Sequence, residues 1–245
     1  MNYDSLADIY ELQYANYRDD IAFYARLAER LGATQILELG AGNGRVSVPM
    51  ARRGFEMTAL EPSAKMLEKA RVYAARENVK INFIEGNARD FKLGKTFALI
   101  IAPFNMLMHL YTLSDQDSAL ECIKNHLEAG GVFAFDLYQP RFGTEGVLRH
   151  EGETFRLPGG SRLDIFLQQN NDKNLQICTT TYYADTIKPD KTLQREIITL
   201  TQRYYTRFEL ERWLKDFRLE WHGDFDGERL DQNSPSLIGV ARKIE

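Results

Sequence analysis

The first 136 residues alternate short apolar runs with segments of helical periodicity. The apolar runs predict strands at 35–39, 56–60, 80–85, 96–102 and 132–136, and the periodic segments predict helices at 19–31, 45–53, 63–77 and 114–128. Strands that alternate with helices form a parallel sheet with both faces covered. The chain is therefore predicted to be an α/β protein.

The pattern of predicted elements changes after Asp136. Strand-like runs at 162–169, 174–183 and 192–204, with a predicted turn at 170–173, indicate an antiparallel β insert after the fifth strand. A helix at 206–216 and strands at 218–225 and 236–242 then complete a Rossmann-like seven-stranded sheet with helices on both faces. We expect residues 1–136 and 205–245 to form this core, and residues 137–204 to form a lid over its site.

Three local signals predict where helices begin and end. Ser114 with Asp117, and Thr206 with Glu209, have the spacing of a capping box, in which each side chain binds the backbone N–H of the other residue. The glycines at 130–131 are predicted to end the helix that begins at Ser114.

The overall charge argues against nucleic acid as a partner. The 245 residues carry a formal net charge of -4, whereas a phosphate backbone is held chiefly by lysine and arginine. The longest apolar stretch, at 97–104, is too short to cross a bilayer, so no membrane partner is expected.

Cysteine usage and the N-terminal sequence indicate a reducing compartment. Cys122 and Cys178 lack the spacing of a zinc site or of a disulfide framework. The N-terminal stretch MNYDSLADIYELQY carries acids where a secretory signal has a basic start and an apolar run. We therefore expect a cytoplasmic protein without a metal site.

Three glycines follow the first predicted strand, in the stretch Glu38-Leu-Gly40-Ala-Gly42-Asn-Gly44. A glycine-rich turn at the tip of a strand in an open α/β sheet lets the backbone approach a ligand closely. A dinucleotide-binding loop would need its third glycine at position 45, where this chain has Arg45. The loop therefore argues against a nucleotide-dependent oxidoreductase.

Glu61 ends the second predicted strand, about twenty residues beyond the loop. A carboxylate at this place can accept hydrogen bonds from both hydroxyls of a ribose, which suits any adenosine-type ligand. The alternative is that Glu61 only caps the helix that starts after Pro62 and Ser63. The residue alone leaves both interpretations open.

Three motifs together resemble the class I methyltransferases that use S-adenosylmethionine (SAM). They are the Glu-x-Gly-x-Gly-x-Gly loop after the first strand, the acid after the second, and Gly86-Asn-Ala-Arg-Asp90 after the third. The likeness covers residues 36–136, and the insert and closing strands resemble the small-molecule branch that includes amino-sugar and glycine or sarcosine N-methyltransferases. It implies SAM as the methyl donor and S-adenosyl-L-homocysteine (SAH) as the product.

The resemblance also implies a set of cofactor-binding residues. Gly40, Ala41 and Gly42 would face the methionine part of SAM, and Glu61 would hold its ribose. The other implied positions lie on the helix after the second strand, in the third-strand motif, after the fourth strand and in the N-terminal segment: Pro62, Met66, Asn87, Ala88, Arg89, Ala102, Phe104, Tyr10 and Tyr17.

For several of these residues, a structural role is the alternative to cofactor binding. Met66, at helical spacing, is more often a core residue. Arg45 either pairs with the SAM carboxylate or is a solvated arginine, since a cation is poorly placed beside a helix N-terminus. Asn87 stands where many family members have aspartate, and an amide can still accept from the adenine amino group and donate to a ring nitrogen. The N-terminal tyrosines either contact the ligand or pack against the sheet.

His109 is the candidate catalytic base. The fourth strand leads into Ala102-Pro-Phe104-Asn-Met-Leu-Met-His109, at the carboxyl edge of the sheet beside the donor methyl. A histidine with a pKa near neutrality is suited to take the proton of an ammonium acceptor, and the sugar N-methyltransferases that this region resembles have a histidine or tyrosine there. The alternative is a structural histidine. Tyr14 is the second catalytic candidate, because in similar enzymes this segment lends tyrosine hydroxyls to the substrate.

The methyl acceptor is predicted to be a small molecule. DNA and RNA methyltransferases carry an Asn/Asp-Pro-Pro-aromatic tetrad after this strand, whereas Ala102-Pro-Phe-Asn105 stands here. We expect a SAM-dependent methyltransferase that favours an amine over a hydroxyl. The alternative is a non-catalytic SAM- or SAH-binding module. We also expect a homodimer that forms through the insert, because exposed strand edges there can pair with a second subunit.

Overall fold

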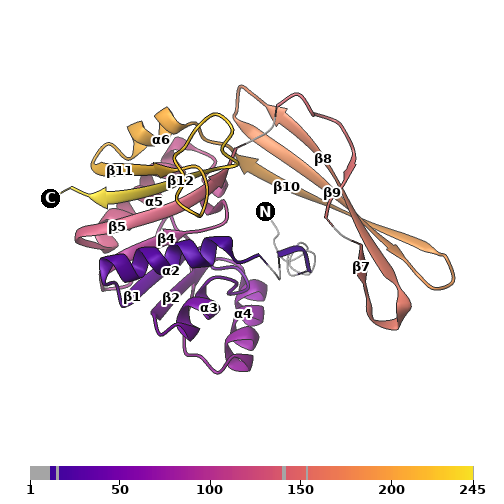
Figure 1. Ribbon diagram of the computed structural model, residues 1–245, viewed down its shortest axis with the longest axis horizontal. Helices are drawn as coiled ribbons and strands as arrows, with labels where there is room; N and C mark the ends of the chain where they lie inside the picture. Colours follow the sequence, from indigo (N-terminus) through magenta and orange to yellow (C-terminus); the bar gives the residue numbers. More distant parts are fainter. Residues whose placement is uncertain (1–11, 15–16, 140–141, 153, 245) are drawn as a thin grey trace. The chain divides into compact units, whose positions relative to one another are not determined.

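The computed structural model describes residues 12–14, 17–139, 142–152 and 154–244. The chain divides into two compact units (Figure 1). One unit contains Asn16–Gln139 and Tyr205–Glu245, and the other contains Pro140–Tyr204 and Met1–Ala15. The first unit, which carries the glycine loop, is therefore made from two stretches of sequence with the insert between them.

The first unit is built on a seven-stranded mixed sheet (Figure 1). Its strands lie in the order β11-β12-β5-β4-β1-β2-β3, and within this sheet β12 alone is reversed, since it is antiparallel to both of its neighbours, β5 and β11. The predicted Rossmann-like sheet is confirmed. The strand bounds are β1 Gln35–Leu39, β2 Glu56–Glu61, β3 Asn82–Glu85, β4 Phe97–Ala102, β5 Leu127–Tyr138, β11 Phe217–His222 and β12 Ser236–Lys243.

The order of the strands reverses at β1. This strand pairs with β2 on one side and with β4 on the other, both in parallel. Ligands of open α/β sheets bind outside the carboxyl ends of the strands at such a reversal. Because the glycine loop follows β1 directly, the topology places it at that point.

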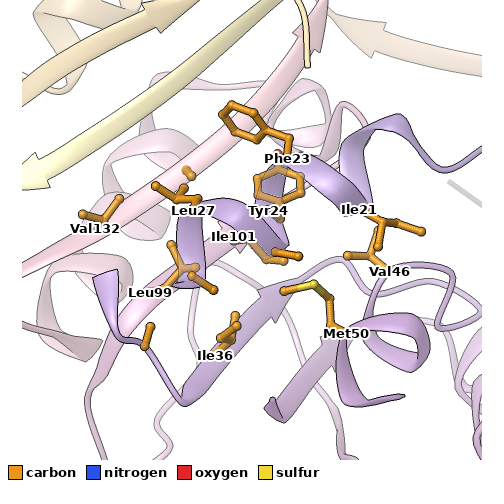
Figure 2. Packing of buried hydrophobic residues seen from close by; sticks show 14 of the residues in the cluster. Ile21, Phe23, Tyr24, Leu27, Ile36, Val46, Met50, Leu99, Ile101 and Val132 are labelled. Carbon is orange, nitrogen blue, oxygen red and sulfur yellow. The ribbon is translucent and has the colours of Figure 1, made fainter. Parts of the chain in front are cut away.

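Helices cover the sheet. The buried face of α2 includes Tyr24, which packs in one cluster with Ile36 of β1 and Leu99 of β4 (Figure 2). Leu37 and Ile100 point to the opposite face and are also fully buried, so both faces are covered. No helix in the described part of the chain is long and apolar enough to span a membrane. The helices described in this unit are α2 Asp19–Leu31, α3 Ser47–Arg52, α4 Ala64–Arg76, α5 Leu113–His126, α6 Arg207–Trp213 and the short 3₁₀ helix η1 Met106–His109.

The start of α5 differs from the prediction. Thr112 is the N-cap: its side chain accepts a hydrogen bond from Asp115 N at 3.0 Å, and the Asp115 carboxylate accepts one from Thr112 N at 3.2 Å. The capping box predicted at Ser114 and Asp117 is wrong, because the helix already begins at Leu113.

The two other boundary predictions are also wrong. The glycines at 130–131 lie inside β5, where the register with β4 shifts and Gly130 has a φ of 67°. Glycine in a left-handed conformation is typical of such a bulge. Thr206 is the N-cap of α6, but its side chain makes no capping hydrogen bond, so the predicted box with Glu209 does not define this helix.

The second unit is an antiparallel sheet in the order β10-β9-β8-β6, with β7 also paired to β8. Leu163, Ile165 and Leu167 share its buried face, as their alternation predicted. The turn predicted at 170–173 is wrong, because β8 and β9 stay paired as far as Asp172 and Ile177 and the chain turns at 173–176. The bounds are β6 Arg149–His150, β7 Phe155–Arg156, β8 Arg162–Asp172, β9 Ile177–Ile187 and β10 Leu193–Arg203.

Candidate functional site

The glycine loop combines close packing with open space at the carboxyl end of β1. Gly40, Gly42 and Gly44 have φ values of 70°, 56° and 81°, which glycine adopts without strain. A Cβ added to Gly40 would lie 2.5 Å from Cγ of Met106, whereas one added to Gly42 would meet no atom within 4 Å. Gly40 therefore permits contact with η1, and Gly42 borders space that a ligand can enter.

Glu61 joins this loop to the turn before α4. The side chain is 5% exposed, and its carboxylate accepts hydrogen bonds from Gly42 N and from Ser63 N, both at 2.9 Å. The N-cap of α4 is Ser63, whose hydroxyl accepts a hydrogen bond from Met66 N at 3.2 Å. Helix capping is therefore the task of Ser63, and Glu61 fixes the loop and the turn relative to each other.

Glu38, the first acid of the loop motif, is buried beneath the loop rather than at its surface. It is 1% exposed and accepts a hydrogen bond from the Ser47 hydroxyl at the start of α3. Burial raises the pKa of Glu38 to about 8, so the carboxyl group is mostly protonated at neutral pH. The residue joins β1 to α3 and serves the structure of the loop.

Asn87 is held by its neighbour in the third-strand motif. Its Oδ1 accepts hydrogen bonds from Arg89 N at 3.1 Å and from Arg89 Nε at 2.9 Å, while Arg89 Nη1 donates to Asp115 at 2.8 Å. An amide oxygen has two lone pairs, and both have a partner here. The orientation is set by Arg89, which has only donors, so the oxygen of Asn87 is already engaged and its NH2 group points away from these two bonds.

The apolar residues of the predicted set differ in exposure. Met66 is 2% exposed, which agrees with its alternative as a core residue. Ala102 is fully buried at the end of β4, and Ala41 is buried within the glycine loop. Pro62 is exposed between β2 and α4, and Ala88 is half-buried. Of these, Pro62 and Ala88 present surface to solvent.

Arg45 is neither solvated nor free. It is 7% exposed, and its guanidinium binds the carboxylate of Asp20 at 2.9 and 2.5 Å. The same guanidinium lies over the rings of Phe104 and Tyr17, with its Cζ 4.6 and 5.3 Å from the ring centroids. The solvated alternative is therefore wrong, because the buried Asp20 compensates the cation at this helix N-terminus.

Two acids at this edge escaped the sequence analysis. Asp20 is 0% exposed in the first turn of α2, and Asp136 is 5% exposed near the end of β5. Burial, together with the charge of Asp20, raises the pKa of Asp136 to about 6. The only signal in the sequence was that an acid ends the apolar run 132–135, which is an unfavourable place for a charge without partners.

His109, the candidate base, is the last residue of η1 and is partly buried. Its Nδ1 lies 3.3 Å from the Tyr111 hydroxyl. Burial lowers the pKa of His109 to about 4, below the near-neutral pKa that the sequence analysis expected. The imidazole is therefore uncharged at neutral pH, so it can accept a hydrogen bond but is a weak base.

The N-terminal tyrosines fall into different parts of the chain. Tyr17 is half-buried, and its ring centroid lies 5.7 Å from that of Phe104. Burial and the charge of Asp20 raise the pKa of Tyr17. Tyr14 belongs to the unit that contains the insert, and Tyr10 lies outside the described residues. Of the three, Tyr17 is the one that the structure places with the core residues predicted to bind the cofactor.

One region of the chain matches a known protein family. Residues 36–131 match the family described as a methyltransferase domain. The chain is 28% identical over 108 residues to the ubiquinone biosynthesis O-methyltransferase of Rickettsia akari (strain Hartford), which covers 44% of this chain and 41% of that protein. It thus spans about two fifths of the length of that relative.

Two further matches extend beyond this region. The chain is 27% identical over 161 residues to the dTDP-3-amino-3,4,6-trideoxy-alpha-D-glucopyranose N,N-dimethyltransferase of Streptomyces venezuelae, which covers 60% of this chain and 66% of that protein. The structure of the CcbJ methyltransferase from Streptomyces caelestis aligns with a TM-score of 0.76 and 26% identity, over 93% of this chain and 90% of that one. These matches confirm the predicted resemblance.

Proposed function

We propose that this chain, whose residues 36–131 form a methyltransferase domain, transfers the methyl group of SAM to an amine of a small molecule. The contact between Glu61 and the glycine loop carries the proposal. Glu61 Oε2 lies 2.9 Å from Gly42 N, so an acid suited to ribose borders the open space at Gly42. An adenosine-containing ligand requires these two features side by side.

Asn43 supplies an independent reason to expect a ligand at this loop. Its Oδ1 is buried and has no hydrogen-bond partner among the described residues. A buried acceptor without a partner costs about 1–3 kcal/mol, so a ligand with a hydrogen-bond donor is favoured. The ammonium group of SAM is such a donor, and the loop residues therefore fit the cofactor.

The chain's own residues then have to orient the reactants and handle one proton. When bound, SAM supplies a methyl carbon on a sulfonium; the amine nitrogen attacks it in line, the C–S bond breaks, and its electron pair goes to sulfur. Glu61 and Gly42 orient the donor. The neutral imidazole of His109 accepts a hydrogen bond from the amine N–H and so orients the nitrogen, while the proton that the methylated nitrogen loses goes to water, because an imidazole with a pKa near 4 does not hold it.

An amine is the favoured acceptor for two reasons. The name of the Streptomyces venezuelae relative specifies an N,N-dimethyltransferase of a dTDP-linked amino sugar, and oxygen acceptors need a stronger base than an imidazole with a pKa near 4. The Rickettsia relative is an O-methyltransferase, so oxygen is the competing acceptor atom. SAH release with a panel of amino sugars, glycine and catechols distinguishes the two, and turnover of catechols alone would contradict the amine.

Calorimetric titration with SAM, SAH and NADH tests the cofactor site. Glu61→Ala is expected to weaken SAM and SAH binding by at least about tenfold, because a hydrogen bond to a charged group is lost. Glu56→Ala, at the exposed start of the same strand, is the matched control and should bind as the wild type does. Binding of NADH in place of SAM would overturn the proposal.

The alternative of a non-catalytic SAM- or SAH-binding module makes a different prediction. In that case the protein binds both compounds, Glu61→Ala weakens binding, and no acceptor in the panel releases SAH. His109→Ala then leaves ligand binding unchanged and affects only stability, whereas in a methyltransferase the loss of the imidazole that orients the amine would lower the turnover rate.

We also propose that the insert pairs two copies of the chain. β10 is an edge strand of the antiparallel sheet, and its Leu193 and Ile197 are 54% and 61% exposed. Edge strands with apolar side chains readily pair with a second chain. Sedimentation is expected to show a dimer that Ile197→Lys converts to a monomer, and a monomeric wild type would refute this arrangement.

A further inference from the structure

We infer that Asp136 is a positioning residue for the proposed SAM site: it holds Phe104 and Asn105 in a left-handed turn and so fixes where Met106 lies against the glycine loop. The inference rests on the proposed function, since SAM is taken as the ligand of that loop. Asp136 acts through the backbone of residues 103–105, which are called the β4–η1 turn below.

The β4–η1 turn has an uncommon backbone. Phe104 and Asn105 have φ values of 55° and 65°. The left-handed region is disfavoured for any residue with a Cβ, although asparagine tolerates it better than most. Two such residues in succession persist only where surrounding contacts hold them, and backbones of this kind are concentrated at functional sites.

Strand β5 supplies those contacts. The Asp136 carboxylate accepts a hydrogen bond from Phe104 N, at 2.9 Å to Oδ1 and 3.0 Å to Oδ2. The backbone carbonyl of Asp136 accepts one from Asn105 N at 3.1 Å. Tyr138 N donates to Asn105 Oδ1 at 2.6 Å. Both left-handed residues are therefore bound to β5, and the Asp136 side chain holds the first of them.

The turn determines where η1 begins. Asn105 O accepts a hydrogen bond from Met108 N at 2.9 Å, which forms the first turn of η1. Met106 lies so near Gly40 that a Cβ on that glycine would be 2.5 Å from the methionine Cγ. His109 is the last residue of η1. A displaced turn would therefore move both the side chain that packs on the glycine loop and the candidate base.

Asp136 has a second partner that separates its structural role from its positioning role. The Tyr24 hydroxyl, from the buried face of α2, donates to Asp136 Oδ1 at 2.6 Å. Oδ1 accepts from both Tyr24 and Phe104, and Oδ2 accepts from Phe104, so an asparagine would replace one of these acceptors with an NH2 group, a donor that faces another donor. Loss of the tyrosine hydroxyl removes the contact with α2 and leaves the contact with Phe104 in place.

The first test compares Asp136→Asn with Tyr24→Phe by calorimetry with SAM, at a temperature well below the Tm of each variant. Both variants are expected to lower Tm, because each removes a buried hydrogen bond. Asp136→Asn should weaken SAM binding about tenfold, while Tyr24→Phe leaves the Kd for SAM unchanged. Equal effects of the two variants on the Kd would show that Asp136 is merely structural.

A second pair of variants keeps the inference testable should Asp136→Asn fail to fold. Asn105→Gly and Asn105→Ala both remove the acceptor for Tyr138 N and differ in how readily residue 105 adopts a left-handed backbone. We expect Asn105→Ala to bind SAM about fivefold more weakly than Asn105→Gly. Equal Kd values would overturn the inference. A wild type that does not bind SAM would instead overturn the proposed function.

Discussion

The two halves of the carboxyl edge of the core sheet are held together in different ways. The first half, called the β2–β3 half, includes the glycine loop and the ends of β2 and β3. Here Glu61 binds Gly42, which is 19 residues away in the sequence. In the β4–β5 half, Asp136 binds Tyr24 across 112 residues. The first half is fastened by bonds within one motif, and the second by bonds between α2 and the strands. We therefore expect substitutions in the first half to act mainly on ligand binding, and those in the second half to change unfolding as well as binding.

The largest effect is expected at the ion pair between Arg45 and Asp20. Arg45→Met leaves Asp20 buried without its partner, and removal of one member of a buried pair costs about 3–5 kcal/mol. Urea unfolding measures this loss. The double variant Arg45→Met with Asp20→Asn should recover much of it, because no unpaired charge remains. A loss below about 1 kcal/mol for the single variant would show that the ion pair between α2 and the glycine loop contributes little to stability.

The difference between the halves also explains what the sequence could predict. The glycine loop and Glu61 were predictable, because their spacing follows from a strand, a turn and the next strand. Arg45 was misjudged, since its partner Asp20 comes from a helix that precedes the sheet. Asp136 was missed because its role depends on which strands become neighbours. Sheet order is a long-range property that local patterns do not contain.

The fold shows the same division. The alternation of strands and helices predicted the sheet, and the period of two predicted the buried face of the insert. The N-cap of α5 was predicted two residues beyond its true position, because Thr112 and Ser114 both have suitable side chains and tertiary packing decides between them. The glycines at 130–131 look like a helix stop but form a bulge, which only the pairing of β4 with β5 reveals.

Substitution of Gly40 tests the contact between the glycine loop and η1, where the two halves meet. Gly40→Ala should destabilise the protein by about 3 kcal/mol, since the new Cβ would overlap Met106 and alanine is strained at a φ of 70°. Gly42→Ala is the matched control: its φ is similar, but its Cβ would meet open space, so about 1 kcal/mol is expected. Equal losses in urea unfolding would show that contact with η1 contributes nothing.

The pH dependence of unfolding is the next test of the β4–β5 half. The pKa of Asp136 is raised to about 6, whereas an unfolded aspartate has its ordinary pKa near 3.8. The folded state therefore favours the protonated acid, and this stabilisation is present below pH 4 and lost as the pH rises through 6. Between pH 4 and 7, the free energy of unfolding should fall by roughly 2–3 kcal/mol more in the wild type than in Asp136→Asn. Parallel curves would contradict the raised pKa.

The smallest effect is expected in the β2–β3 half, at Asn87, and it concerns binding alone. Both lone pairs of its Oδ1 are engaged by Arg89, so the side chain presents donors where the adenine amino group also donates. Asn87→Asp would keep one oxygen on Arg89 and add a second that accepts from that amino group, which should tighten SAH binding about fivefold. Asn82→Asp, at the exposed start of β3, adds the same charge as a control. Tighter binding with an unchanged Tm would support the division between the halves, whereas weaker binding would mean that the Asn87 amide donates to a ring nitrogen and that the acceptor for the amino group lies elsewhere.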